Sequence, residues 1–211
     1  IPNTVEADGP AGIRVTAETT DKDGNAVYNY CTAFPIGTLL AQTWNTDLVN
    51  RVGKAIGEEM VEIGVTLWLA PGMNIHRDPL CGRNFEYYSE DPLVAGLCAA
   101  ADTRGIQSHA GIGTSIKHFA ANNQEDNRMY VNEHISERAM REIYLKGFEI
   151  CIAEGKPQNI MSSYNKINGV WSHYNYDLCT TVLRGEWGYE GVVITDWWMR
   201  SSPDPDFPDL W

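Results

Sequence analysis

The chain lacks several features that would mark a common class of function. Basic residues are outnumbered, with 16 Lys and Arg against 28 Asp and Glu and a net charge of −12 over 211 residues. This balance argues against nucleic acid and against an anionic membrane surface, because both reward basic patches. No apolar run is long enough to span a membrane. We therefore expect a globular protein whose partner is neither nucleic acid nor a membrane.

Metal-binding and disulfide patterns are also missing. The five cysteines are widely spaced and include no Cys-x-x-Cys pair, and the histidines include no His-Glu-x-x-His motif. An odd number of dispersed cysteines favours free thiols, and thus a reducing cytoplasm over the periplasm or secretion. Nothing in these patterns indicates a metal or another cofactor. The absence of a Gly-x-Ser-x-Gly segment and of a Cys–His signature removes two rival nucleophiles.

Helix-like and strand-like segments alternate along the chain. Apolar stripes and capping residues predict helices at about 45–63, 91–107, 136–151 and 177–186. Runs of apolar and β-branched residues predict strands at 65–69, 112–117, 159–163 and 191–195, with two weaker candidates at 4–6 and 31–34. This alternation predicts a parallel sheet with right-handed crossovers.

Two parallel-sheet folds fit that order, a doubly wound open sheet and a (β/α)8 barrel. No Gly-rich phosphate turn follows any predicted strand, which disfavours a nucleotide-binding doubly wound fold. We predict an α/β fold, a (β/α)8 TIM-like barrel that is incomplete in this chain at about six βα units. Residues 201–209 are rich in Pro and Asp and are typical of a loop. Residues 1–211 would then be part of a barrel domain whose remainder lies outside the chain.

The last predicted strand, 191–195, ends in Asp196, and Trp197 and Trp198 follow at once. A carboxylate just past the C-terminal end of a parallel strand stands where barrel enzymes place catalytic groups. Two neighbouring indoles offer a flat apolar wall that suits the face of a sugar ring. The segment by itself equally allows Asp196 to cap the next helix.

Polar residues also follow the other predicted strands. Together they include Asp, Arg, Lys, His and Tyr, the donors and acceptors needed for a polyhydroxylated ligand. Structural roles stay open for several of them. Arg83 and Glu86 could form an ion pair. His118 could be a hydrogen-bonded histidine behind the site, and Tyr164 could be part of the core. Glu125 would lie in a solvated loop.

Six segments between residues 8 and 197 carry a more specific pattern. They are DGPAGIR (8–14), LAPGMNIHRDP (69–79), CGRNFEYYSEDP (81–92), KHFAANNQE (117–125), MSSYNKING (161–169) and LRGEWGYEG (183–191) running into TDW (195–197). In this order they resemble glycoside hydrolase family 3, and in particular its β-glucosidase branch. The resemblance covers nearly the whole chain.

The resemblance implies a catalytic residue and a set of substrate-binding residues. Asp196, in the Thr-Asp-Trp segment, would be the nucleophile. The residues implied to hold the sugar are Asp8, Arg14 (as the group that orients Asp8), Arg83, Lys117, His118, Arg128, Met161, Tyr164 and Trp197. We expect Lys117 and His118 to hold the pKa of Asp196 down, because a nucleophilic carboxylate must be ionised.

The implied activity is that of a retaining, exo-acting β-glucosidase. Such an enzyme hydrolyses terminal β-D-glucosyl residues of β-glucosides or cello-oligosaccharides through a glycosyl-aspartate intermediate. The family's N-acetylglucosaminidase branch carries a catalytic His in a Gly-His-Gly-Asp segment, where this chain has AANNQE (120–125), so that branch is disfavoured. In the glucosidase branch the acid/base Glu comes from another domain, here expected from the rest of the polypeptide or a partner chain. The alternatives are a β-xylosidase, another family-3 exo-glycosidase and a non-catalytic carbohydrate-binding fragment.

Overall fold

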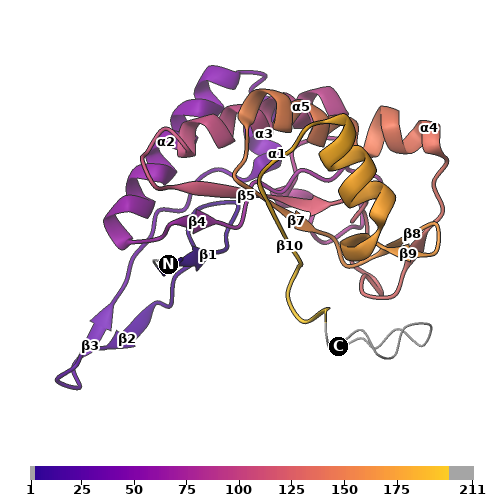
Figure 1. The fold of residues 1–211 in the computed structure, drawn as a ribbon. Helices are drawn as coiled ribbons and strands as arrows, with labels where there is room; N and C mark the ends of the chain where they lie inside the picture. Colours follow the sequence, from indigo (N-terminus) through magenta and orange to yellow (C-terminus); the bar gives the residue numbers. More distant parts are fainter. Residues whose placement is uncertain (1–2, 200–211) are drawn as a thin grey trace.

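The computed structural model describes residues 3–199, and its centre is a parallel sheet (Figure 1). The predicted loop at 201–209 lies outside the described residues. The strands of this sheet follow one another in chain order: β1 (Glu6–Ala7), β4 (Leu67–Trp68), β5 (Gly113–Phe119), β7 (Asn159–Ser162) and β10 (Val192–Ile194). Each strand pairs in parallel with the next. A doubly wound sheet reverses its order at a switch point, so the unbroken order is that of a barrel.

The barrel prediction is confirmed, although one of the six candidate strands is wrong. Within residues 3–199 the barrel sheet has five strands, and the segment 31–34 is not among them. Its backbone bonds elsewhere: the N–H of Thr32 donates to Glu59 Oε1 at 2.7 Å, and that of Phe34 to the carbonyl of Ala11 at 2.9 Å. These loop and side-chain contacts satisfy the backbone without a neighbouring strand.

Helices cover one face of the sheet (Figure 1). They are α1 (Gly37–Gln42), α2 (Thr46–Ile63), α3 (Pro92–Ile106), α4 (Glu137–Ala139), η2 (Met140–Tyr144), α5 (Lys146–Gly155) and η4 (Asp177–Glu186), with short turns η1 (Asn84–Glu86) and η3 (Ser172–Tyr174). Asn45 caps α2, which ends at Gly64 with a φ of 77°, a conformation that favours glycine. The helix predicted from residue 136 is divided by a wider turn, in which the N–H of Leu145 bonds to the carbonyl of Met140. No helix in the described range is long and apolar enough to cross a membrane.

Side chains alternate between the two faces of the sheet, as the strand period of two requires. Trp68, Ile116 and Ile160 are fully buried under the helices. Their neighbours Leu67 and Met161 form a separate small cluster with Leu69. This small cluster of Leu67, Leu69 and Met161 lies on the face of the sheet that the helices leave open, which is the inner face of the barrel.

Two small sheets outside the barrel were not predicted. The hairpin of β2 (Glu18–Thr20) and β3 (Ala26–Tyr28) projects from the body and is exposed along its whole length (Figure 1). β6 (Asn132–Glu133), β8 (Lys166–Ile167) and β9 (Val170–Trp171) form the other sheet. Each of these strands has two or three residues, too few for the alternation that marks a strand in a sequence.

A buried carboxyl lies between the closely packed helices α2 and α3. A Cβ on Gly53 of α2 would come within 2.7 Å of Asp102 Oδ1, so only glycine fits there. The Tyr88 hydroxyl donates to Asp102 Oδ2 at 2.8 Å. Burial raises the pKa of Asp102 to about 7, and the bond from Tyr88 offsets only part of this effect.

This shift predicts how stability depends on pH. Between the ordinary value of 3.8 and about 7, folded Asp102 keeps a proton that the unfolded chain has released. The free energy of unfolding should therefore fall as pH rises through that window, by up to about 1.4 kcal/mol per pH unit, and level off above it. Urea denaturation from pH 4.5 to 8 should show this slope relative to Asp102→Asn. Parallel curves for the two proteins would mean that Asp102 is ionised in the folded state.

Candidate active site

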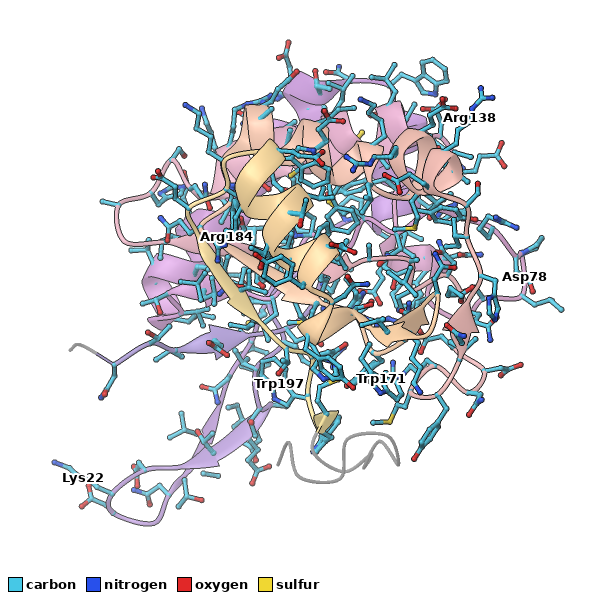
Figure 2. The ribbon with its side chains drawn as sticks, turned by 45° about the vertical axis from the view of Figure 1, so that its right-hand side comes forward. Lys22, Asp78, Arg138, Trp171, Arg184 and Trp197 are labelled. Carbon is cyan, nitrogen blue, oxygen red and sulfur yellow. The ribbon has the colours of Figure 1, made fainter. Side chains whose placement is uncertain are left out.

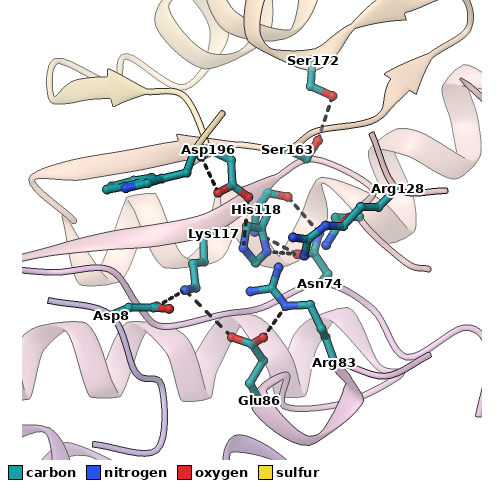
Figure 3. A network of polar contacts seen from close by, with 12 residues as sticks. Asp8, Asn74, Arg83, Glu86, Lys117, His118, Arg128, Ser163, Ser172 and Asp196 are labelled. Carbon is teal, nitrogen blue, oxygen red and sulfur yellow. Dashed lines mark hydrogen bonds and ion pairs between the residues drawn. The ribbon is translucent and has the colours of Figure 1, made fainter. Parts of the chain in front are cut away.

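A cleft of about 930 Å³ opens where the parallel strands end. Figure 3 shows several of its polar side chains and the contacts between them. Loops that follow β1, β4, β5, β7 and β10 contribute its walls. All ten residues singled out in the sequence line it: Asp8, Arg14, Arg83, Lys117, His118, Arg128, Met161, Tyr164, Asp196 and Trp197. The carboxyl ends of parallel strands meet at one end of a barrel, which explains how residues so far apart in sequence come together.

One side of the cleft is a chain of ion pairs centred on Lys117. Its Nζ donates to Asp8 Oδ1 at 2.6 Å and lies 4.0 Å from Glu86 Oε2, and Glu86 also accepts a bond from Arg83 Nε. Burial alone would raise the pKa of Asp8, but the Lys117 ammonium and its hydrogen bond bring it below the ordinary value. Arg14 Nη1 lies 3.4 Å from Asp8 Oδ2 and is mostly exposed. Lys117 therefore holds Asp8 more closely than Arg14 does.

Glu125 lies in a loop, as expected, but its side chain is only partly exposed and lines the cleft. Its Oε2 accepts a bond from Arg128 Nη1 at 2.8 Å, and its Oε1 lies 4.0 Å from Arg83 Nε. Arg128 in turn lies over the ring of Tyr164, 4.7 Å from the ring centre. The i, i+3 spacing of Glu125 and Arg128 was a signal for this ion pair, but it did not show that the pair faces a cleft.

Asp196 lies two residues past β10, with its side chain largely buried against β5 and the loop after β7. The N–H of Trp197 donates to its Oδ1 at 2.7 Å, and the Tyr164 hydroxyl lowers the pKa of the carboxyl. Burial raises the pKa of Asp196 above its ordinary value, and these two groups together with Arg83 and Lys117 offset only part of the rise. The expectation that Lys117 would help to lower this pKa is correct in direction, but burial outweighs the contribution of Lys117 and the net pKa is raised.

His118 faces Asp196 and is itself buried. Its Nε2 lies 3.7 Å from Asp196 Oδ2, and its Nδ1 lies 3.0 Å from the Tyr87 hydroxyl. Burial, together with the cations Arg83, Lys117 and Arg128, lowers the pKa of His118 well below its ordinary value. The ring is neutral at physiological pH, so it interacts with Asp196 as a dipole and not as a cation.

Aromatic side chains form the outer wall of the cleft. Trp197 lies just beyond β10, on the side of the sheet away from the helices (Figure 2). Trp198 and Phe85 also line the cleft, and about half of Phe85 is exposed. Flat, partly exposed rings beside charged groups are suited to a ligand with both apolar faces and hydroxyl groups, such as a sugar.

The described residues give less support to chemistry that depends on a metal ion or on paired thiols. Across 3–199 there is no group of three or more His, Cys, Asp or Glu side chains that could hold a metal ion. The five cysteines are free thiols. The cleft offers instead a set of cations and carboxylates at hydrogen-bonding distance from one another, which can exchange their mutual bonds for bonds to a polyhydroxylated ligand.

The chain belongs to glycosyl hydrolase family 3. Residues 2–206 match the model described as "Glycosyl hydrolase family 3 N terminal domain". The chain is 54% identical to "Beta-glucosidase A" of Butyrivibrio fibrisolvens over 198 residues, covering 94% of this chain and 23% of that protein. It is 48% identical to the "Exo-alpha-(1->6)-L-arabinopyranosidase" of Bifidobacterium breve, covering 93% of this chain and 26% of that protein. The chain thus spans about a quarter of the length of these relatives.

Solved structures agree in fold. β-Glucosidase 3B from Thermotoga neapolitana, in complex with glucose, is 56% identical with a TM-score of 0.88, over 93% of this chain and 27% of that chain. A β-glucosidase from Kluyveromyces marxianus, also in complex with glucose, is 39% identical with a TM-score of 0.87, over 94% of this chain and 23% of that chain. Both structural alignments cover more than nine-tenths of this chain.

Proposed function

We propose that the chain is the nucleophile-bearing part of a retaining, exo-acting β-glucosidase. The observation that carries the proposal is the Asp196 carboxyl at the end of β10, largely buried in a cleft that it shares with Asp8, Arg83 and Lys117. Two relatives with similar barrels bind glucose in their solved structures. Asp196 would attack the anomeric carbon and form a glycosyl-aspartate, which water then hydrolyses.

The remaining residues would bind the sugar. Asp8 and Lys117 form a paired carboxylate and ammonium, so they offer an acceptor and a donor to adjacent hydroxyls. Arg83, His118 and Arg128 would supply further donors. Tyr164 would hold Asp196 through its hydroxyl, and Met161 and Trp197 would supply apolar contact with the ring.

The raised pKa of Asp196 fits this role if the bound sugar completes its environment. Burial makes the free carboxylate costly, and a desolvated anion is a stronger nucleophile than a fully hydrated one. Arg83 and Lys117 each lower the pKa of Asp196, so their positive charge opposes the effect of burial on the carboxylate.

We propose that the acid/base Glu comes from outside residues 3–199, in another domain of the same polypeptide or in a partner chain. Two other carboxylates of the cleft, Glu86 and Glu125, are both ion-paired with arginine and so are poorly placed to donate a proton. A retaining enzyme needs its two carboxyl groups about 5 Å apart on opposite sides of the scissile bond. On this proposal residues 1–211 are part of the family-3 barrel domain and work with the missing segments.

A substrate comparison tests the proposed activity. The complete enzyme should show its highest kcat/KM on nitrophenyl β-D-glucoside among matched aryl β-glucoside, β-xyloside and α-L-arabinopyranoside substrates. The arabinopyranoside is included because a relative with 48% identity carries that activity in its name. A higher kcat/KM on either pentoside would replace the β-glucosidase assignment with that of the corresponding exo-glycosidase.

A further inference from the structure

Tyr87 lies directly behind the cleft residue His118 and is fully buried. It follows η1, the short turn that carries Glu86, and it does not line the cleft itself. Its hydroxyl oxygen is 3.0 Å from His118 Nδ1 and accepts a hydrogen bond from Asn122 Nδ2, also at 3.0 Å. All three side chains are at least nine-tenths buried, so these polar atoms have to satisfy one another.

The direction of each hydrogen bond follows from counting donors and acceptors. Asn122 Nδ2 also lies 3.4 Å from Glu125 Oε1, an acceptor, which fixes the amide with its nitrogen toward both Glu125 and Tyr87. The Tyr87 oxygen thus accepts from Asn122, and its own hydrogen is left to donate. Among residues 3–199, the remaining group within bonding distance of that hydroxyl is Nδ1 of His118.

Asn74 offers a competing arrangement for His118. Its Oδ1 lies 3.3 Å from Nδ1, so it could accept a hydrogen from that nitrogen. However, the same oxygen already accepts from the backbone N–H of His118 at 2.8 Å, and the Asn74 amide donates back to the His118 carbonyl. A hydrogen on Nδ1 would also leave the Nε2 lone pair facing the Asp196 carboxylate at 3.7 Å, which is repulsive.

We propose that Tyr87 is a positioning residue that sets the tautomer of His118. Its hydroxyl donates to Nδ1, so the single N–H of the neutral imidazole sits on Nε2 and points at Asp196 and the ligand space. Asn122 supports this arrangement, because its amide donates a hydrogen bond to the Tyr87 oxygen and leaves the Tyr87 hydrogen to donate to Nδ1. For its effect on turnover the inference rests on the proposed function, because it assumes that His118 and Asp196 act on the substrate.

The first test compares Tyr87→Phe with Tyr88→Phe in the complete enzyme. Both variants remove one buried hydroxyl, but that of Tyr88 bonds Asp102 between the helices. Tyr87→Phe should lower kcat/KM by about 10- to 100-fold, the effect of losing one hydrogen bond to a group that interacts with a charge. Tyr88→Phe should keep nearly full activity. Equal activities of the two folded variants would overturn the proposal.

The pH profile separates positioning from a loss of packing. Without Tyr87 the His118 hydrogen should move to Nδ1, and the Nε2 lone pair should raise the pKa of Asp196 further. The acid limb of kcat/KM should then shift to higher pH in Tyr87→Phe and stay in place in Tyr88→Phe. The other groups that face Asp196 are Arg83, Lys117 and Tyr164, and neither variant changes them. An unshifted limb in Tyr87→Phe would contradict the proposal.

A double-mutant cycle shows whether Tyr87 acts through His118. In a His118→Ala background, Tyr87→Phe should cause little further loss of kcat/KM, whereas an undiminished loss would mean that Tyr87 does not act through His118.

If Tyr87→Phe does not fold, Asn122→Asp serves instead, because its carboxylate would draw the Tyr87 hydrogen away from Nδ1 of His118. Unchanged activity of Asn122→Asp would refute the proposal. Asp196→Asn separates failure of the proposed function from failure of this inference. An active Asp196→Asn enzyme would refute the proposed function. An inactive Asp196→Asn enzyme together with normal turnover by Tyr87→Phe would refute only the inference about Tyr87.

Discussion

Asp196→Asn is expected to lower kcat by about 10⁴- to 10⁶-fold, the usual range for loss of a nucleophile. An amide of the same shape does not attack an anomeric carbon. The fold should survive, because Asn keeps the side-chain volume and its Oδ1 can still accept from the N–H of Trp197. Burial raises the pKa of Asp196, so its ionised form is costly in the free enzyme. The melting temperature of the variant should therefore equal or exceed that of the parent.

Steady-state kinetics with an aryl β-glucoside measures this loss, and Asp177→Asn is the matched control. Asp177 is an exposed carboxylate at the start of η4 and lies outside the cleft. The Asp177→Asn variant should keep the kcat and KM of the parent enzyme. Parental turnover by folded Asp196→Asn would remove Asp196 from the reaction, and equal losses in both variants would point to damage to the fold.

The second large effect is expected from Asp8→Ala, with kcat/KM reduced by about 100- to 10,000-fold. Asp8 is the closest partner of the buried Lys117, which would be left with Glu86 at 4.0 Å. The variant loses one charged acceptor for a sugar hydroxyl and also misplaces a donor, and each charge-assisted bond contributes about 1.5 to 3 kcal/mol. Stability should change less, because Asp8 is in a Gly- and Pro-containing turn and is only partly buried.

Kinetics and thermal melting of the same preparation separate these two effects. Asp23→Ala, on the exposed turn of the β2–β3 hairpin, is the control and should match the parent in both measurements. Near-normal kcat/KM in Asp8→Ala would show that Asp8 does not hold substrate. A large fall in melting temperature would instead make the Asp8–Lys117 pair a structural feature.

The parts of the fold with strong local signals were predictable from the sequence. Asn45 and Gly64 mark the ends of α2, and Asp91 followed by Pro92 marks the start of α3, because caps act through adjacent backbone groups. The strands β6, β8 and β9 were missed, since two residues have no measurable periodicity. The pairing of β6 with β8 joins segments more than thirty residues apart, such as Asn132 with Lys166, whereas β8 and β9 pair locally as a hairpin.

The sequence allowed us to predict which residues line the cleft, but not the direction in which the pKa of Asp196 is shifted. The position of Asp196 after a β-branched strand placed it at the mouth of the barrel. Its pKa depends on how completely the neighbouring loops exclude water, which no sequence pattern describes. The same limit applies to Tyr87, whose contact with His118 joins residues 31 positions apart and leaves no spacing signal.

The most direct test of the account is covalent trapping of the nucleophile. The complete enzyme would be inactivated with an activated 2-deoxy-2-fluoro-β-glucoside, digested, and mapped by mass spectrometry. In a retaining mechanism the fluorosugar accumulates on the attacking carboxylate. We predict a single adduct on Asp196, absent from the Asp196→Asn variant. An adduct on Glu86, Glu125 or Asp8, or inactivation without any adduct on this chain, would contradict the account.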